Sequence, residues 1–202
     1  GTLHEKNDAQ LIHEAVEGGP EAFDELVRRY QDRVYNLLFR LCSHEQDAED
    51  LTQEVFIKVF HSLGDFRSQS GFYTWLYRIT ANSFYSHCRK QRSRKVIKTV
   101  PLQVSVTASD EERVSAIPAS PQPDPQDIVQ SHETVEIIQE AIDSLPEEHR
   151  MVVVLKDVDG LEYQEIAEIL DWPIGTVKSR LHRVRKELVE KLKDILDLDK
   201  ER

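Results

Sequence analysis

Apolar residues recur every three or four positions through most of the chain before residue 96 and again after residue 130, which is the spacing of amphipathic helices. The first such stretch begins at Asp8, which we expect to cap it, and it stops at Gly18. Pro20 is placed to open a second and longer helix, because proline is favoured in a first turn. The apolar face of this helix is predicted to contain Phe23, Leu26, Val27, Tyr30, Val34, Leu37, Leu38 and Leu41.

Two more helices are predicted before residue 96. Ser43, with Gln46 three residues later, has the pattern of a capping box, so a third helix should run from here through Phe60. A fourth helix is expected to begin near Gly71 and to continue into a segment rich in Arg and Lys. The buried face of the third helix is predicted to be Ala48, Leu51, Val55 and Val59.

Residues 96–130 separate these helices from the rest of the chain. This segment holds five of the eight prolines, and its other residues are largely Ser, Gln, Val and acids. Proline at this density excludes a regular helix and favours extended chain, so we interpret 96–130 as a linker. The sequence therefore predicts an all-α protein with two small helical domains, at residues 1–95 and 131–202.

Four helices are predicted after the linker. The first starts at Ser131. Residues 144–147 (Ser-Leu-Pro-Glu) have the pattern of an N-cap, a first-turn proline and a capping glutamate, with Ser144 as the cap. They introduce the run from Met151 to Leu155, which is predicted as helix although its composition is β-prone. A short helix from Glu162 to Leu170 and a long one from Thr176 complete the chain.

The last two predicted helices have the form of a helix-turn-helix, because a short apolar helix, a turn with Pro173 and Gly175, and a basic amphipathic helix follow one another. One face of the last helix is apolar and should be buried. Its other positions hold polar and basic side chains that can bind base edges and phosphates of duplex DNA. A merely solvated face is the alternative, and the Ser and His among the basic residues favour the groove of DNA. The candidate contacts are Thr176, Lys178, Ser179, Arg180, His182, Arg183 and Arg185.

Aromatic residues are concentrated in and just before the fourth helix. Seven of the 15 aromatic residues of the chain lie between positions 66 and 85. We interpret Phe72, Trp75, Leu76 and Ile79 first of all as a core stripe, since they share one helix face. A second face combines aromatic, amide and guanidinium groups, which suits unstacked bases of a single strand. This face is formed by Arg78, Asn82, Tyr85 and Arg89.

The third helix carries an apolar residue among polar ones on its outer face. Ile57 lies there with Asp50, Gln53, Glu54 and His61. A single exposed isoleucine is common on protein surfaces. An apolar centre with a charged rim is also typical of a protein-docking patch. The residues alone leave both interpretations open.

Charge changes the picture of the partners. The 202 residues have a formal net charge of −11, which by itself argues against nucleic acid. The average is misleading, because residues 78–98 hold seven basic residues and no acid, and residues 178–193 are also mainly basic. Two basic segments on an acidic chain predict two separate anionic contacts and an acidic surface that a basic protein can bind.

Several function classes are excluded or disfavoured. The longest purely apolar run, Met151 to Leu155, is far shorter than the roughly 20 residues of a membrane span, so we expect a soluble cytoplasmic protein without membrane insertion. Cys42 and Cys88 have no zinc-binding spacing, and neither a metal nor a cofactor is expected. An enzyme using acid pairs or the His87–Cys88 pair is disfavoured, because the sequence has no Gly-rich phosphate loop, HExxH motif or nucleophile elbow.

Taken together, these segments resemble bacterial RNA polymerase sigma factors of the extracytoplasmic-function (ECF) group. Residues 48–60 (AEDLTQEVFIKVF) are similar to region 2.2, and residues 66–82 (FRSQSGFYTWLYRITAN) to regions 2.3 and 2.4. Residues 145–150, 160–170 and 173–183 are similar to region 4. Phe60 is a departure, since the family often has Trp there.

The resemblance implies a role for each segment. Asp50, Gln53, Glu54 and Ile57 would dock on the clamp helices of the largest polymerase subunit. The second domain would contact the β flap of core RNA polymerase and read the −35 element of promoter DNA through the helix-turn-helix residues named above. An anti-sigma factor is a further implied partner. The residues that would open and read the −10 element are Phe66, Arg67, Ser68, Phe72, Tyr73, Trp75, Arg78, Asn82, Tyr85 and Arg89.

A dimeric helix-turn-helix regulator that binds duplex operators without polymerase is the alternative. The last 65 or so residues on their own allow it. It requires neither the aromatic and basic helix near position 80 nor a surface for polymerase. Tight and specific duplex binding by the chain alone would favour this alternative.

Overall fold

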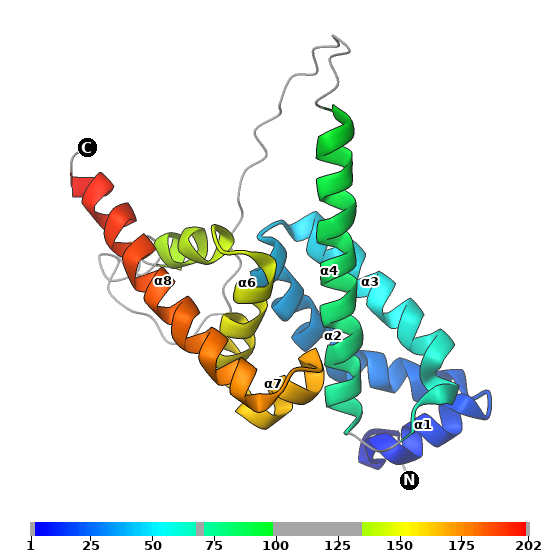
Figure 1. Ribbon diagram of the computed structural model, residues 1–202. Helices are drawn as coiled ribbons and strands as arrows, with labels where there is room; N and C mark the ends of the chain where they lie inside the picture. The colour runs from blue at the N-terminus through cyan, green and yellow to red at the C-terminus, as the bar shows by residue number, and fades with distance from the viewer. Residues whose placement is uncertain (1–2, 68–70, 99–134, 201–202) are drawn as a thin grey trace, which may run out of the picture.

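The structure is a computed structural model that describes residues 3–67, 71–98 and 135–200, with the backbone alone for 95–98 and 194–200. Every regular element in these ranges is helical, so the all-α prediction is confirmed (Figure 1). The first domain contains η1 (Leu3–Glu5), α1 (Asp8–Val16), α2 (Pro20–Cys42), α3 (Glu45–Ser62), η2 (Leu63–Asp65) and α4 (Phe72–Lys98). The second contains a helix over residues 135–143, α6 (Glu147–Val153), a π-helical turn η3 (Val154–Val158), α7 (Tyr163–Leu170) and α8 (Ile174–Lys200).

The caps of the first helices differ from those predicted. Asn7, and not Asp8, caps α1, because its side chain accepts a hydrogen bond from the backbone N–H of Gln10 while the Gln10 side chain accepts one from Asn7. Ser43 adopts a left-handed conformation with φ of 58° and ends α2, its N–H donating to the carbonyl of Phe39. Ser43 is therefore not available as the N-cap of α3, and His44 takes that place without a side-chain bond.

Two boundaries in the second domain also differ. The hydroxyl of Ser144 donates to the carbonyl of Ala141 at the end of the preceding helix, so Pro146 rather than Ser144 is the N-cap residue of α6. The last helix starts at Ile174, two residues before the predicted Thr176. The cause is Pro173, whose carbonyl accepts hydrogen bonds from the backbone N–H groups of residues 176 and 177. The predicted start at Ser131 and most of the predicted linker lie outside the described residues, and α4 continues to Lys98.

The β-prone run Met151–Leu155 is helical, as predicted, and it passes from α6 into η3. All five of its side chains are buried, so packing inside the domain overrides their local preference for strand. The π-helical turn widens the helix at its end, where the N–H of Asp159 donates to the carbonyl of Val154 five residues earlier, at 2.9 Å.

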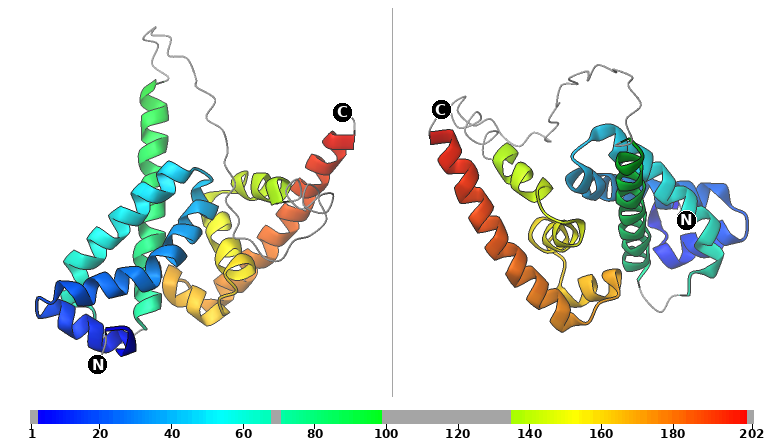
Figure 2. Two further views of the ribbon diagram at one scale, coloured as in Figure 1. Left: turned by 180° about the vertical axis from the view of Figure 1, so that it is seen from behind. Right: turned by 45° about the horizontal axis from the view of Figure 1, so that its top comes forward.

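Helix α4 runs along the joint between the two domains, where the end of α2 also meets the second domain (Figures 1 and 2). It packs against α2 and α3 on one side and against α6 and α7 on the other. The buried side chains of both domains consequently form one continuous apolar cluster. Domains of this size bury only ~60% of their unfolded surface when they fold separately, and here each domain adds to the buried surface of the other. Among the described helices, none has a stretch long and apolar enough to cross a membrane.

The buried and exposed positions assigned in α2 and α1 are tested by one truncation in each helix. Leu38 is 0% exposed, and Leu38→Ala should lower the free energy of unfolding by about 2–5 kcal/mol, because it leaves a cavity in the core. Val16 is 51% exposed, and Val16→Ala should change it by less than about 0.5 kcal/mol. Urea unfolding of both variants measures the difference. Equal effects would show that the assigned buried face is wrong.

Candidate nucleic-acid interface

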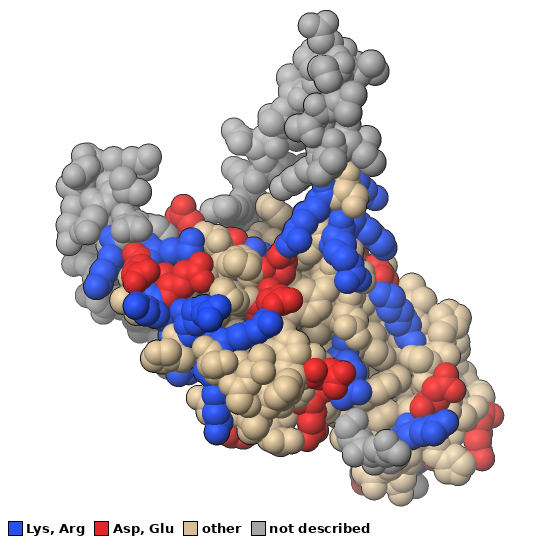
Figure 3. Space-filling view, in the orientation of Figure 1, with Lys and Arg blue, Asp and Glu red and all other residues tan. Residues whose placement is uncertain are grey.

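The basic face of α8 is exposed where the helix-turn-helix pattern predicts it. Val177, Leu181 and Val184 are buried against the rest of the domain. The side chains opposite them are open to solvent, and Figure 3 shows Lys and Arg gathered over α8 and over α4. Since the backbone of a helix fixes which side chains face the core, burial of the apolar stripe presents the basic one. The exposed candidates are Lys178, Ser179, His182, Arg183 and Arg185.

Two arginines that flank this face are held by their own domain. The Arg180 guanidinium lies 4.2 Å from the centre of the Trp172 ring and forms an ion pair with Glu148. Arg185 Nε donates to Asp157 Oδ2 at 3.0 Å. These contacts restrict both guanidinium groups to the border of the face, which suits the predicted flanking role. Thr176 is half-buried, and its carbonyl accepts a hydrogen bond from the Ser179 hydroxyl at 3.1 Å.

Three aromatic residues form a cluster at the start of α4. The ring centres of Phe66 and Trp75 are 5.1 Å apart, and the centre of Phe72 lies 5.9 Å from Phe66 and 5.8 Å from Trp75. Phe72 is buried, whereas the other two are half-buried and open on one side. We call these three residues the aromatic cluster. Its buried member, Phe72, packs against two rings that remain partly accessible. Arg67 beside it is exposed, and Ser68 lies outside the described residues.

The second face of α4 is only partly open. Asn82 and Arg89 are exposed as expected. Arg78, however, donates from Nη2 to the backbone carbonyl of Glu168 in α7 at 2.7 Å. The hydroxyl oxygen of Tyr85 is buried and has no hydrogen-bond partner among the described residues, and burial raises the pKa of this tyrosine. The expectation that these four residues share an open face is therefore wrong for Arg78 and Tyr85 in this arrangement, because the second domain packs there.

Tyr73 also belongs to the buried side of this contact. Its ring centre lies 4.2 Å from that of Tyr77, and the Arg33 guanidinium from α2 lies 6.0 Å above it. Burial raises the pKa of both tyrosines. Of the ten predicted −10 residues, Tyr73 is therefore placed toward the joint between the domains and not toward open solvent.

On α3, the predicted docking residues lie on an exposed surface. Asp50 and Gln53 are exposed, and Ile57 is 58% exposed. Glu54 forms an ion pair with Lys58 at 2.6 Å, and the hydrogen bond from Lys58 lowers the pKa of this carboxyl. Asp50 accepts a hydrogen bond from Gln46 at 3.2 Å. The four residues therefore occupy one accessible side of the helix.

Phe60 extends this surface and was not among the predicted docking residues. It is 57% exposed and lies one helical turn after Ile57. Its ring meets that of Phe23 in α2 edge to face, with centres 5.1 Å apart. The spacing of three residues between Ile57 and Phe60 is the signal that identifies it, because residues at this spacing are neighbours on a helix surface.

Polar contacts hold the two domains together at the other end of the joint. The Arg150 guanidinium donates from Nη1 to the carbonyl of Leu41 in α2 at 2.6 Å. Gln139 donates to the carbonyl of Arg40 at 3.0 Å and to the hydroxyl of Ser43 at 2.9 Å. Together with Arg78 these side chains bond mainly to backbone oxygens across the joint. We call the joint, from Arg78 at one end to Arg150 at the other, the closed interface.

An acidic residue, Asp159, lies within the closed interface. Asp159 is half-buried, and its Oδ2 has no hydrogen-bond partner among the described residues. Loss of solvent raises the pKa of this carboxyl to about 6, while Arg40, the Tyr77 hydroxyl and Arg33 act in the opposite direction. A raised pKa means that the closed interface favours the protonated acid.

The two thiols are poor nucleophiles in this structure. Cys42 and Cys88 are free and half-buried. Burial raises the pKa of Cys42 to about 12 and also raises that of Cys88, so both remain protonated near neutral pH. Among the described residues, no group of three or more His, Cys, Asp or Glu side chains is placed to hold a metal ion.

Comparisons with known proteins agree with this geometry. The family model described as "Sigma-70 region 2" matches residues 26–94, and "Sigma-70, region 4" matches residues 135–188. The chain is 37% identical over 190 residues to the ECF RNA polymerase sigma-E factor of Escherichia coli (strain K12), covering 94% of this chain and 96% of that protein. It is 34% identical over 195 residues to the RNA polymerase sigma-H factor of Pseudomonas aeruginosa, covering 96% and 98%.

Solved structures share the fold. The sigma factor RpoE of Bartonella quintana, solved with the anti-sigma factor NepR, matches with a TM-score of 0.59 and 27% identity over 85% of this chain and 96% of that one. CnrH, solved with the cytosolic domain of CnrY, matches with a TM-score of 0.61 and 22% identity over 95% and 98%.

The two helical domains, each matched by a family model, thus identify a transcription initiation factor that binds DNA. The chain belongs to the sigma-70 family, in its ECF group, and it contains regions 2 and 4 of that family. It is accordingly a sigma factor that directs promoter-specific transcription initiation, and sigma factors are not enzymes.

The closed interface should depend on pH through Asp159. Its pKa is about 6 in the closed arrangement and returns toward the ordinary 3.8 when the domains separate, so the closed arrangement binds the extra proton between these values. Lowering the pH from 7 to 5 should therefore increase the closed fraction, which small-angle scattering measures. In Asp159→Asn this increase of the closed fraction between pH 7 and pH 5 should vanish. The same profile in both proteins would contradict the assignment.

Proposed function

We propose that the exposed residues Asp50, Gln53 and Ile57 of α3, with Glu54, bind the clamp helices of the largest subunit of core RNA polymerase. The observation that supports this most is the apolar centre on an otherwise polar surface, where Ile57 and Phe60 are both more than half exposed. Such a centre loses water on binding while the charged rim sets the orientation. The second domain is proposed to contact the β flap, so that both domains are held on the polymerase.

We propose that the two basic faces read promoter DNA in different states. The N-terminal end of α8, with Lys178, Ser179, His182 and Arg183, enters the major groove of the −35 duplex, where such groups bind base edges. The aromatic cluster and the exposed Asn82 hold bases of the −10 non-template strand, which stack on rings once the duplex opens. Arg180 and Arg185 position the helix beside the phosphates.

The closed interface gives this mechanism an order of events. Arg78 and Tyr85 are occupied by the second domain, so the free chain presents an incomplete −10 surface. Docking of both domains on polymerase separates them and releases these residues. Polymerase then holds the two DNA-binding faces at one promoter, where their effective concentration makes two weak contacts act together.

An anti-sigma factor is proposed as the partner of the chain when it is not on polymerase. RpoE of Bartonella quintana was solved with the anti-sigma factor NepR, and it shares this fold. The net charge of −11 leaves acidic surface outside the basic faces for a protein with basic residues. The proposed place of action is the cytoplasm, where polymerase and the chromosome are found.

Run-off transcription tests the proposal. The chain is added to core RNA polymerase and genomic fragments of its host, and defined start sites are expected only when both proteins are present. Specific duplex binding by the chain without polymerase, together with no transcript, would instead support the dimeric helix-turn-helix regulator.

Two substitutions should separate the roles of the domains on a promoter selected in this way. Arg183→Ala should weaken closed-complex formation about fivefold or more, since a base contact of an arginine contributes about 1–3 kcal/mol. Lys193→Ala, which removes the same charge farther along α8 from an exposed position, should have a much smaller effect.

Asn82→Ala should leave the closed complex intact and reduce permanganate reactivity of the −10 region. Normal melting by the Asn82 variant would refute its assignment.

A further inference from the structure

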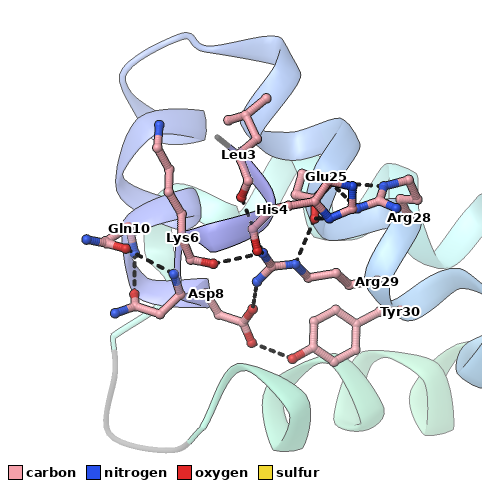
Figure 4. Close-up of polar contacts among 10 residues, drawn as sticks. Leu3, His4, Lys6, Asp8, Gln10, Glu25, Arg28, Arg29 and Tyr30 are labelled. Carbon is pink, nitrogen blue, oxygen red and sulfur yellow. Dashed lines mark hydrogen bonds and ion pairs between the residues drawn. The ribbon is translucent and has the colours of Figure 1, made fainter. Parts of the chain in front are cut away.

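Arg29 fastens the start of the chain onto α2 (Figure 4). Its guanidinium donates to the backbone carbonyls of Leu3, His4 and Lys6 at 3.3, 3.1 and 2.7 Å, and to Asp8 Oδ1 at 3.0 Å. One planar group thus binds four acceptors of the segment that contains η1 and the first turn of α1. These bonds from a side chain of α2 add to the packing of α1, whose Leu11 is fully buried, in setting the position of this segment.

Glu25 holds the Arg29 guanidinium by a hydrogen-bonded ion pair. Its side chain is 6% exposed and accepts a hydrogen bond from Arg29 Nε at 3.0 Å and one from Arg28 Nε at 2.9 Å. The Arg28 hydrogen bond lowers the pKa of this carboxyl, which stays ionised at neutral pH. A buried charge with two guanidinium partners holds Arg29 in a single orientation.

Asp8 links Arg29 to Tyr30 by hydrogen bonds to both side chains. One oxygen of the Asp8 carboxylate accepts from Arg29, and the other accepts from the Tyr30 hydroxyl. The Tyr30 ring meets Phe72 edge to face, with ring centres 5.3 Å apart and an interplanar angle of 67°. Phe72 is the buried member of the aromatic cluster. A continuous chain of contacts therefore joins the N-terminal segment to the rings at the start of α4.

In this series of contacts, the orientation of the Tyr30 ring depends on its hydroxyl group. An edge-to-face contact depends on the rotation of both rings. Packing alone confines the Tyr30 ring loosely, whereas a hydrogen bond from its far end to an anchored carboxylate fixes its direction. Tyr30 is half-buried, and this burial, followed by the hydrogen bond to Asp8, raises the pKa of its hydroxyl, so the hydroxyl stays protonated and donates to Asp8.

We propose that Tyr30 and Asp8 are positioning residues for promoter opening. They hold Phe72, and through it Phe66 and Trp75, in the arrangement that receives the −10 bases. Neither residue contacts DNA in this scheme. The inference rests on the proposed role of the aromatic cluster in −10 capture, and it makes the N-terminal segment a determinant of melting rather than of polymerase binding.

Tyr30→Phe tests this directly in the reconstituted holoenzyme, because it removes one oxygen and keeps the ring. On a promoter fragment selected by run-off transcription, permanganate reactivity at −10 should show the opening equilibrium reduced roughly fivefold, the factor that corresponds to one hydrogen bond. Affinity for core polymerase and closed-complex formation should stay within twofold of the unchanged chain. A purely structural defect would lower all three measurements by a common factor, and that result would overturn the proposal.

Tyr35→Phe is the matched control. Tyr35 lies on the same helix, is half-buried, and stacks on Phe39 with ring centres 6.0 Å apart, away from the aromatic cluster. The same loss of one hydroxyl should leave opening unchanged. An equal defect in Tyr35→Phe would contradict a specific role of Tyr30.

A double substitution tests whether the two residues act as one unit. Asp8→Ala should reduce opening at least as much as Tyr30→Phe, and Tyr30→Phe should have no further effect in the Asp8→Ala chain. Additive losses would show that the hydroxyl does not act through Asp8. Trp75→Ala distinguishes failure of the proposed −10 role: normal opening by this variant would refute the role of the aromatic cluster, whereas impaired opening by Trp75→Ala with full opening by Tyr30→Phe would refute only the positioning role.

Discussion

The packing of the second domain against α4 is the contact on which the rest of this structure depends. Helix α4 contributes one side to the core with α2 and α3, and its other side is covered by α6 and α7. Small helical domains have little core of their own, so an exposed side of α4 would leave apolar surface in water. The two domains cover that surface for each other, and at the same time they cover part of the face that is proposed to read DNA.

The chemistry of the closed interface suits a contact that is made and broken. Its apolar part is continuous with the core, but Arg78, Gln139 and Arg150 reach across it to backbone oxygens that water can also bind. Interfaces of this mixed kind are typical of domains that move relative to one another. A partner shifts such an equilibrium only by binding the open arrangement better than the closed one. Core polymerase meets this condition in the proposed mechanism, because it holds the two domains apart.

Local patterns in the sequence were sufficient for the helices and for the faces of α8, since burial there follows helical spacing alone. The apolar stripe of α3 was predicted for the same reason. The caps were harder, because Asn7 and Asp8 are equally good candidates by type and only the backbone decides between them. The covering of Tyr85 and Arg78 by the second domain could not be predicted, since their neighbours come from residues about 60–90 positions later in the chain. The positions of Tyr30 and Asp8 beside the aromatic cluster are likewise properties of the tertiary structure.

The need for the domains to separate is tested most directly by locking them together. Arg92→Cys and Glu147→Cys replace an ion pair between α4 and α6 in a chain whose own two cysteines are changed to alanine. A thiol-reactive cross-linker with a cleavable disulfide then joins the domains, and His13→Cys with Glu17→Cys in α1 serves as the control pair. The linked chain should open no promoter with core polymerase until the linker is cleaved, while the chain with the control pair should open it throughout. Equal promoter opening before and after cleavage would contradict the account.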